Sequence, residues 1–195
     1  MTNLITNYRP ISELPYFFQD SSKAYGLTTY LDKFALFSPV QFGFQRGLST
    51  YMYMALMDMQ TSIISDAMNS NKYFLGVFFD ISKAVDTVNY VLLINKLEYY
   101  GIRGVAEQWF FDYLRNRSQF LSLRGITSPS LEITSGVPQG SILGPILFLI
   151  YLNDLDRVSN KLKLIIFADD TNAFLSPNSL DVLFDIMNSE LCKNS

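Results

Sequence analysis

The sequence predicts an α+β protein, an antiparallel β-sheet backed by helices, and three observations lead to that prediction. Hydrophobic residues make up 49% of the 195-residue chain and charged residues 17%, which is the composition of a folded globular protein. Apolar segments with helical spacing alternate with short strand-like runs. These segments lack the regular alternation of a parallel βαβ protein, which leaves the α+β class.

The first elements are predicted from spacing and from capping residues. One helix is expected at residues 24–37, within an N-terminal region otherwise rich in proline and glycine. A long helix is expected after Ser49, a residue type that favours helix N-caps. Met59 and Ile63 belong to its apolar stripe, which we expect in the core. Residues 73–81 form an aromatic run that predicts a buried strand ending in a carboxylate.

The later elements follow from the same signals. Leu93, Leu97 and Tyr100 have the spacing of one helix face, and Gly101 is placed to end that helix. The remaining predicted elements are a helix at 105–114, a hairpin at 118–136, a helix at 141–153 with Pro145 in its first turn, strands at 161–168 and 173–176, and a helix from Ser179.

Composition excludes several classes of function. The chain has no histidine, so it can hold neither a histidine acid/base nor a Ser-His-Asp triad. The single cysteine, Cys192, can form neither an intrachain disulfide nor a zinc cluster. The longest apolar run, residues 142–152, is too short to cross a membrane, and the N-terminus does not resemble a signal peptide. An intracellular protein without a membrane partner is expected, with nucleus and cytoplasm both open.

Three carboxylates are the candidates for chemistry. Asp169 and Asp170 interrupt an apolar segment between two predicted strands, and Asp80 ends the predicted strand far upstream. If those strands are neighbours in one sheet, the three side chains converge at its edge. Carboxylate oxygens suit Mg²⁺, and two such ions can act together in phosphoryl chemistry. The alternative for the Asp pair alone is a solvated turn.

Two further segments each allow two interpretations. The loop "SGVPQGSILGP", residues 135–145, places glycines before a helix N-terminus, where an anion such as a triphosphate is favoured, although it can equally be a plain strand-to-helix connection. Arg115, Arg117 and Arg124 surround Phe120, which suits either a nucleic-acid template or a solvated basic turn. The net charge of −3 weighs against a standalone nucleic-acid binder.

The ordered motifs resemble those of reverse transcriptases, most closely the non-LTR, LINE-type retrotransposon family. The segments that carry the resemblance are "NYRPIS", "QFGFQRGLST", "FFDISKAVDTVN", "LEYYGIRG", "SGVPQGSILGPILFLIYLNDL" and the FADD box in "FADDT". They cover nearly the whole chain. The resemblance implies a right-hand palm, an antiparallel sheet backed by helices, at residues 73–195, and partial fingers with the fingers-palm connection at residues 1–72.

The resemblance also implies an activity and a set of site residues. The activity is template-directed addition of dNTPs to a DNA primer on an RNA template. Asp80, Asp169 and Asp170 match the family's catalytic aspartates, which bind two Mg²⁺ ions for which Mn²⁺ can substitute. The residues that match the family's nucleotide-binding positions are Gln139 and Gly140 beside the sugar, Lys83, Ala84 and Val85 beneath the triphosphate and ribose, and Arg9 of the fingers.

The chain departs from the family pattern in several places. It has Val85 where an aromatic residue is usual, Gln45 where an arginine is usual, and Asn89-Tyr90 where Asp-His is usual. It stops before the family's last palm motifs and the thumb, so a fragment is expected. The alternatives are therefore a catalytically inactive retroelement remnant that binds nucleic acid weakly at most, and an RNA-dependent RNA polymerase, against which "FADD" and "GVPQGS" argue.

Overall fold

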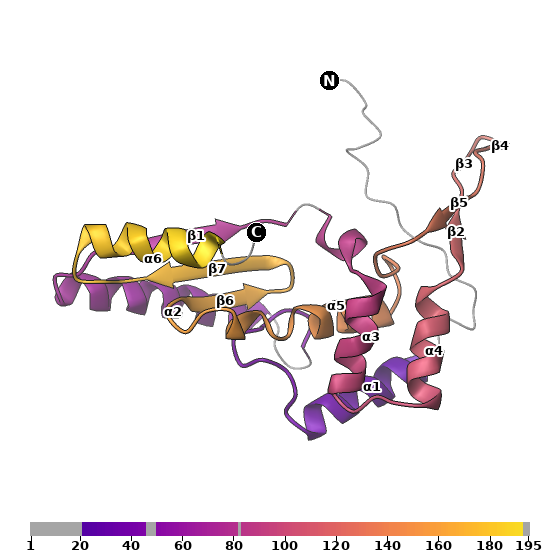
Figure 1. Ribbon diagram of the computed structural model, residues 1–195, viewed down its shortest axis with the longest axis horizontal. Helices are drawn as coiled ribbons and strands as arrows, with labels where there is room; N and C mark the ends of the chain where they lie inside the picture. The colour runs from indigo at the N-terminus through magenta and orange to yellow at the C-terminus, as the bar shows by residue number, and fades with distance from the viewer. Residues whose placement is uncertain (1–20, 46–49, 82, 193–195) are drawn as a thin grey trace. The chain divides into compact units, whose positions relative to one another are not determined.

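A computed structural model describes residues 21–45, 50–81 and 83–192 of the chain (Figure 1). The chain packs into two compact units that interleave along the sequence. Unit 1 comprises Met1–Phe37 and Lys83–Leu152, and unit 2 comprises Ser38–Ser82 and Asn153–Ser195. The predicted boundary between fingers and palm cuts the chain once, between residues 72 and 73, and so does not correspond to these interleaved units. It stays a prediction.

Unit 2 is built on a three-stranded antiparallel sheet. Its strands are β1 (Leu75–Phe79), β7 (Asp170–Leu175) and β6 (Lys163–Phe167), in the order β1-β7-β6. Strands β6 and β7 form a hairpin, and β1 pairs with β7 from the other side. The predicted adjacency of the strand before Asp80 and the strands around the Asp pair is confirmed, as is the mixed helix and antiparallel-sheet class.

Side chains on both faces of this sheet are buried. Ile165 and Phe174 lie on one face and form a cluster with Ile63 of α2 (Thr50–Asn69). Ala173, whose side chain points to the opposite face, is fully buried as well. Burial on both faces stabilises the central strand β7, which carries Asp170.

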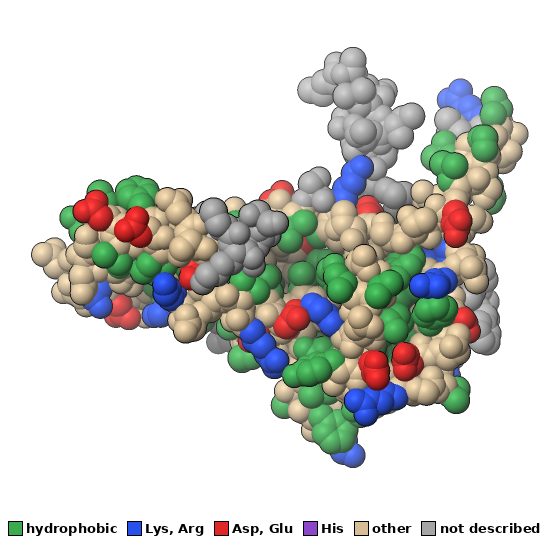
Figure 2. Space-filling model, viewed as in Figure 1, with side chains coloured by type: hydrophobic (Ala, Val, Ile, Leu, Met, Phe, Trp, Pro, Cys, Tyr) green, Lys and Arg blue, Asp and Glu red, His purple; other side chains and the backbone are tan. Residues whose placement is uncertain are grey.

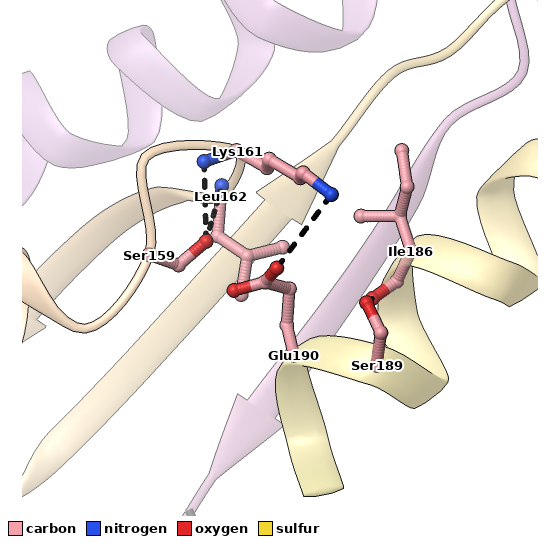
Figure 3. Close-up of polar contacts among 6 residues, drawn as sticks. All are labelled: Ser159, Lys161, Leu162, Ile186, Ser189 and Glu190. Carbon is pink, nitrogen blue, oxygen red and sulfur yellow. Dashed lines mark hydrogen bonds and ion pairs between the residues drawn. The ribbon is translucent and has the colours of Figure 1, made fainter. Parts of the chain in front are cut away.

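The last helix, α6 (Leu180–Cys192), is tied to the turn that leads into β6. Figure 3 shows Lys161 and Glu190 pointing toward one another, with Nζ and Oε1 3.9 Å apart. Glu190 is only 1% exposed, whereas the Lys161 side chain is half exposed. The Ser159 hydroxyl accepts the N–H groups of Lys161 and Leu162 and so shapes the turn.

Unit 1 is helical at its centre. Its helices are α1 (Ser21–Lys33), α3 (Tyr90–Tyr99), α4 (Val105–Leu114) and α5 (Leu143–Leu152). Helix α3 packs against α4 and α5, and α1 packs against α5. The core residues that are at most 2% exposed include Leu31, Leu93, Leu97, Tyr113, Leu114, Leu147 and Phe148.

Local sequence signals explain the helix ends. Asn89 caps α3, because its Oδ1 accepts the N–H of Val91 at 2.9 Å. Gly101 follows with a φ of 89°, a left-handed conformation that favours glycine and stops the helix. Before α5, the Ser141 hydroxyl accepts the N–H of Gly144 at 2.8 Å. The sequence therefore specified these boundaries to within about two residues.

The part of unit 1 between α4 and α5 forms a β-hairpin arm. Strands β2 (Arg117–Gln119) and β5 (Leu131–Ile133) form its base, and β3 (Ser122–Leu123) and β4 (Ile126–Thr127) form its tip. This arm is the predicted hairpin (Figure 1). In Figure 2, hydrophobic side chains and a basic one gather at its end. The exposed hydrophobic residues of the arm, among those whose side chains the structure describes, are Phe120, Leu121, Ile126 and Leu131.

Three predictions from the sequence need correction. The strand at 73–81 is shorter and not buried: β1 is an edge strand with one neighbour, and Phe78 is 68% exposed. Met59 is 46% exposed, so the apolar stripe of α2 reaches the core at Ile63 but not at Met59. The helix expected at 24–37 ends at Lys33, because Ala35 adopts a left-handed φ of 48°.

Candidate active site

The three predicted carboxylates lie at one end of the unit 2 sheet. Phe79, the last residue of β1, pairs with Thr171 of β7. Strand β1 ends at Phe79, so Asp80 follows the last paired residue and lies at the same end of the sheet as Asp170, and both side chains are exposed.

Asp169 lies in the turn that joins β6 to β7. Phe167 pairs with Asp170, so the turn consists of Ala168 and Asp169 alone. The prediction placed the tip at residues 169–172, but β7 already begins at Asp170. Ala168 has a φ of 56°. A left-handed conformation costs an L-residue roughly 1–2 kcal/mol, so other contacts must hold it.

The donor set fits a hard divalent cation. Mg²⁺ is held in proteins by one or two carboxylates, with water and substrate phosphates completing its shell. Asp80, Asp169 and Asp170 offer such oxygens at an exposed sheet end. In the part of the chain that the structure describes, no three His, Cys, Asp or Glu side chains are gathered closely enough to hold a metal by themselves.

Gln41, which the sequence analysis did not single out, holds the turn from the side. Its Oε1 accepts the N–H of Ala168 at 3.0 Å and the N–H of Gly43 at 2.8 Å. Its Nε2 faces the carbonyl oxygen of Ala168 at 3.4 Å. The Gln41 side chain is 3% exposed. A Cβ at Gly43 would collide with the backbone nitrogen of Ala168, so only glycine allows this close approach.

The segment around Gln41 runs parallel to β6. Ile166 donates its N–H to Val40 at 2.8 Å and accepts the N–H of Phe42 at 2.8 Å. The segment begins at Ser38, whose N–H is bound by Asn153 Oδ1 at 2.7 Å. It therefore covers the β6 edge of the sheet next to the carboxylate turn.

Predicted nucleotide-binding residues of unit 1 lie on two loops that dock on each other. Gln139 donates from Nε2 to Oδ1 of Asp86 at 2.9 Å. Val137 donates its N–H to the carbonyl of Val85 at 3.0 Å. A Cβ at Gly136 would meet the Asp86 backbone at 2.6 Å. The contact between the two loops therefore requires glycine at position 136, the first glycine of "SGVPQG".

The other predicted residues of this group differ in exposure. Lys83 is exposed and precedes η3 (Ala84–Thr87) with a φ of 57°. Ala84 is buried, Val85 is half-buried against the core of unit 1, and Gly140 has a φ of 87°. Arg9 lies outside the described residues. The three aspartates belong to unit 2.

Arg117 has a structural task at the base of the arm. Its Nη2 donates to Tyr90 Oη at 2.7 Å and to the carbonyl of Gly136 at 2.6 Å, and its Nε donates to the carbonyl of Leu114 at 3.1 Å. Arg115 instead places its guanidinium 4.0 Å from the centre of the Phe111 ring. Two of the three arginines predicted as a patch are thus engaged within unit 1.

The three aspartates lie at one end of an antiparallel sheet, and the chain belongs to the reverse transcriptase family. Residues 2–193 match the family described as "Reverse transcriptase (RNA-dependent DNA polymerase)". The chain is similar to three Drosophila melanogaster proteins. It is 29% identical to the probable RNA-directed DNA polymerase from transposon X-element over 84% of this chain, 31% identical to that from transposon BS over 71%, and 29% identical to that from mobile element jockey over 77%.

Solved structures support the fold. A telomerase structure from Candida tropicalis superposes on 89% of this chain with a TM-score of 0.61 at 12% identity. The superposed region makes up 31% of that telomerase chain. The present chain spans 18% of the X-element protein and 16% of the BS and jockey proteins. No helix among the described residues is long and apolar enough to cross a membrane.

Proposed function

We propose that the chain is the palm, with part of the fingers, of an RNA-directed DNA polymerase that adds dNTPs to a primer 3′ end on an RNA template. The observation that supports the proposal is the antiparallel pairing of β1 with β7, which brings Asp80 and Asp170 to the same end of the sheet, with Asp169 in the adjoining turn. Such an arrangement allows carboxylates from distant parts of the chain to serve one site.

The three aspartates are proposed to bind two Mg²⁺ ions, which Mn²⁺ can replace. Bound divalent ions neutralise charge on the attacking and leaving oxygens of an in-line displacement. Asp80 and Asp169 are the principal ligands in this proposal, and Asp170 assists them. Asp80 and Asp170 are exposed and Asp169 is half-buried, which leaves room for a primer end and a nucleotide triphosphate to approach.

The docked loops of unit 1 are proposed to bind the incoming nucleotide. Gln139 and Gly140 are assigned to its sugar, and Lys83, Ala84 and Val85 to its triphosphate and ribose. The docking of Gln139 on Asp86 supports this assignment, because a fixed loop orients backbone N–H groups for phosphate binding. Arg9 is assigned to the same nucleotide by family resemblance alone.

The proposal extends to organisation and location. Residues 1–72 are assigned to part of the fingers and the fingers-palm connection, and residues 73–195 to the palm. The dNTP substrates are intracellular metabolites, so we place the protein inside the cell.

The test replaces the matching segment of a complete, active relative with this chain and measures dNTP incorporation on an RNA template. The graft should extend the primer, and Asp80→Asn or Asp169→Asn should abolish extension without unfolding the graft. A folded graft that incorporates nothing, while the relative is active, would instead support an inactive remnant.

A further inference from the structure

We infer that Gln41 is the positioning residue of the carboxylate turn, because its side-chain amide fixes the backbone from which Asp169 and Asp170 project. The inference rests on the proposed function, since it concerns the support of the same candidate metal site. Gln41 and Ala168 are 127 positions apart in the sequence and lie in the same unit.

The amide of Gln41 engages both backbone polar groups of one residue. Its Oε1 accepts the Ala168 N–H at 3.0 Å, and its Nε2 faces the Ala168 carbonyl at 3.4 Å. The N–H of Gly43 also points at Oε1, at 2.8 Å, so two donors identify this atom as the oxygen. With both of its polar groups held, Ala168 cannot rotate its flanking peptides freely.

Ala168 has a backbone conformation that needs stabilising contacts. Ala168 has a left-handed φ of 56°, which an alanine keeps only where its surroundings impose it. Asp169 is the next residue, and Asp170 follows as the first residue of β7. A relaxation at Ala168 would therefore move both carboxylates together.

Gln41 is itself well fixed, which allows it to act as a support. Its side chain is 3% exposed, and its backbone lies in the segment bonded to Ile166. Its carbonyl also accepts Nε2 of Gln45 at 2.6 Å. The positioning group is thus held from both sides, as supporting residues of metal ligands commonly are.

The test combines amide hydrogen exchange with Mn²⁺ titration of the full 195-residue chain. Gln41→Leu removes the side-chain amide that bonds Ala168. Gln41→Asn keeps an amide but shortens the side chain, and provides a second variant if the first does not fold. Ser38→Ala is the matched control. Ser38 is buried in the same segment and its hydroxyl bonds Asp156 at 2.8 Å, at the end of the segment away from the turn.

At equal global stability, the Gln41 variants should exchange the Ala168 amide roughly tenfold faster than the unaltered chain. Their Mn²⁺ affinity should fall about 10–100-fold, as for other residues that orient metal ligands. Ser38→Ala should change neither quantity. Unchanged Ala168 exchange in the Gln41 variants, or an equal increase in Ser38→Ala, would overturn the inference.

The two proposals fail in different ways. If the unaltered chain binds no Mn²⁺, the proposed metal site is wrong, and the exchange rate of the Ala168 amide alone decides the role of Gln41. Suppose instead that a Gln41 variant binds Mn²⁺ as the unaltered chain does while its Ala168 amide exchanges faster. In that case Gln41 holds Ala168 but does not position the carboxylates, and the inference is wrong.

Discussion

At the residue scale, Val85 is the departure with the clearest chemical consequence. The family resemblance implies an aromatic ring here, which would lie against the sugar and exclude a 2′-hydroxyl by steric clash. Valine is smaller, and a pocket without such a wall discriminates poorly against an added hydroxyl, by roughly a hundredfold in apolar precedents. In the graft, Val85→Phe should raise the ratio of kcat/KM for dNTP over rNTP and leave the metal dependence unchanged. An unchanged ratio would contradict this role.

Tyr113 predicts a pH dependence of stability. Burial raises the pKa of its hydroxyl above the ordinary value of 10.0, while the Ser141 hydroxyl and the Arg117 charge lower it in part. Above pH 10.0 the unfolded chain loses this proton before the folded chain does. The free energy of unfolding should therefore fall as pH rises beyond that value, by at most about 1.4 kcal/mol per pH unit for one proton.

Tyr113→Phe should remove this part of the alkaline slope in denaturant unfolding curves. Tyr99→Phe, which removes an exposed hydroxyl from the same unit, is the control and should keep the slope. A slope that Tyr113→Phe does not alter would show that the buried hydroxyl is not its source.

At the scale of elements, Arg117 should stabilise the base of the arm. It donates three hydrogen bonds, which join the arm to Leu114 of α4, to Tyr90 of α3 and to Gly136 of the "SGVPQG" loop. Arg117→Met should lower the free energy of unfolding by about 1.5–3 kcal/mol, the range for a bond to a charged group. Arg115→Met removes the cation–π contact with Phe111 and should cost about 0.5–1 kcal/mol. Equal losses in the two variants, measured by urea unfolding, would refute the assignment.

The attachment of α6 is the second prediction at this scale. Lys161→Met leaves the buried Glu190 carboxylate without this cation, and should destabilise the chain by about 1–3 kcal/mol, less than a fully buried pair because Lys161 is half exposed. Adding Glu190→Gln should recover part of that loss. Lys163→Met, at an exposed position of β6, serves as the control. Strictly additive losses in the double variant would exclude coupling between Lys161 and Glu190.

Local signals account for what the sequence predicted well. The helix at 105–114 was predicted with its observed bounds, and Asn89 and Gly101 mark the ends of α3 as their conformational preferences require. The hairpin around the Asp pair followed from apolar runs on either side of a polar tip. These features depend on residues within one or two turns of each other.

Features that depend on distant partners could not be predicted in this way. The contact between Gln41 and Ala168 spans 127 positions, and no local pattern marks it beyond a glutamine in an apolar stretch before Gly43. The exposure of Phe78 depends on β1 being an edge strand, which sequence spacing does not reveal. The engagement of Arg117 with Tyr90 likewise required the tertiary structure.

At the scale of the whole molecule, unit 2 assembles its sheet from two separate segments of the chain. Strand β1 comes from Ser38–Ser82, and β6 and β7 come from Asn153–Ser195. Asp80 and Asp170 reach the same end of the sheet only after β1 has paired with β7. A cation that bridges them binds the native state alone, and must therefore stabilise it by mass action.

Thermal melting of the 195-residue chain during a Mg²⁺ or Mn²⁺ titration tests this central claim most directly. The melting temperature should rise with metal concentration, and a metal at a hundred times its Kd should add about 2.7 kcal/mol of stability. The rise should persist in Asp58→Asn, which removes an exposed carboxylate of the same unit, and disappear when Asp80→Asn and Asp169→Asn are combined. A rise of the same size in that double variant would contradict the assignment of the metal site to these aspartates.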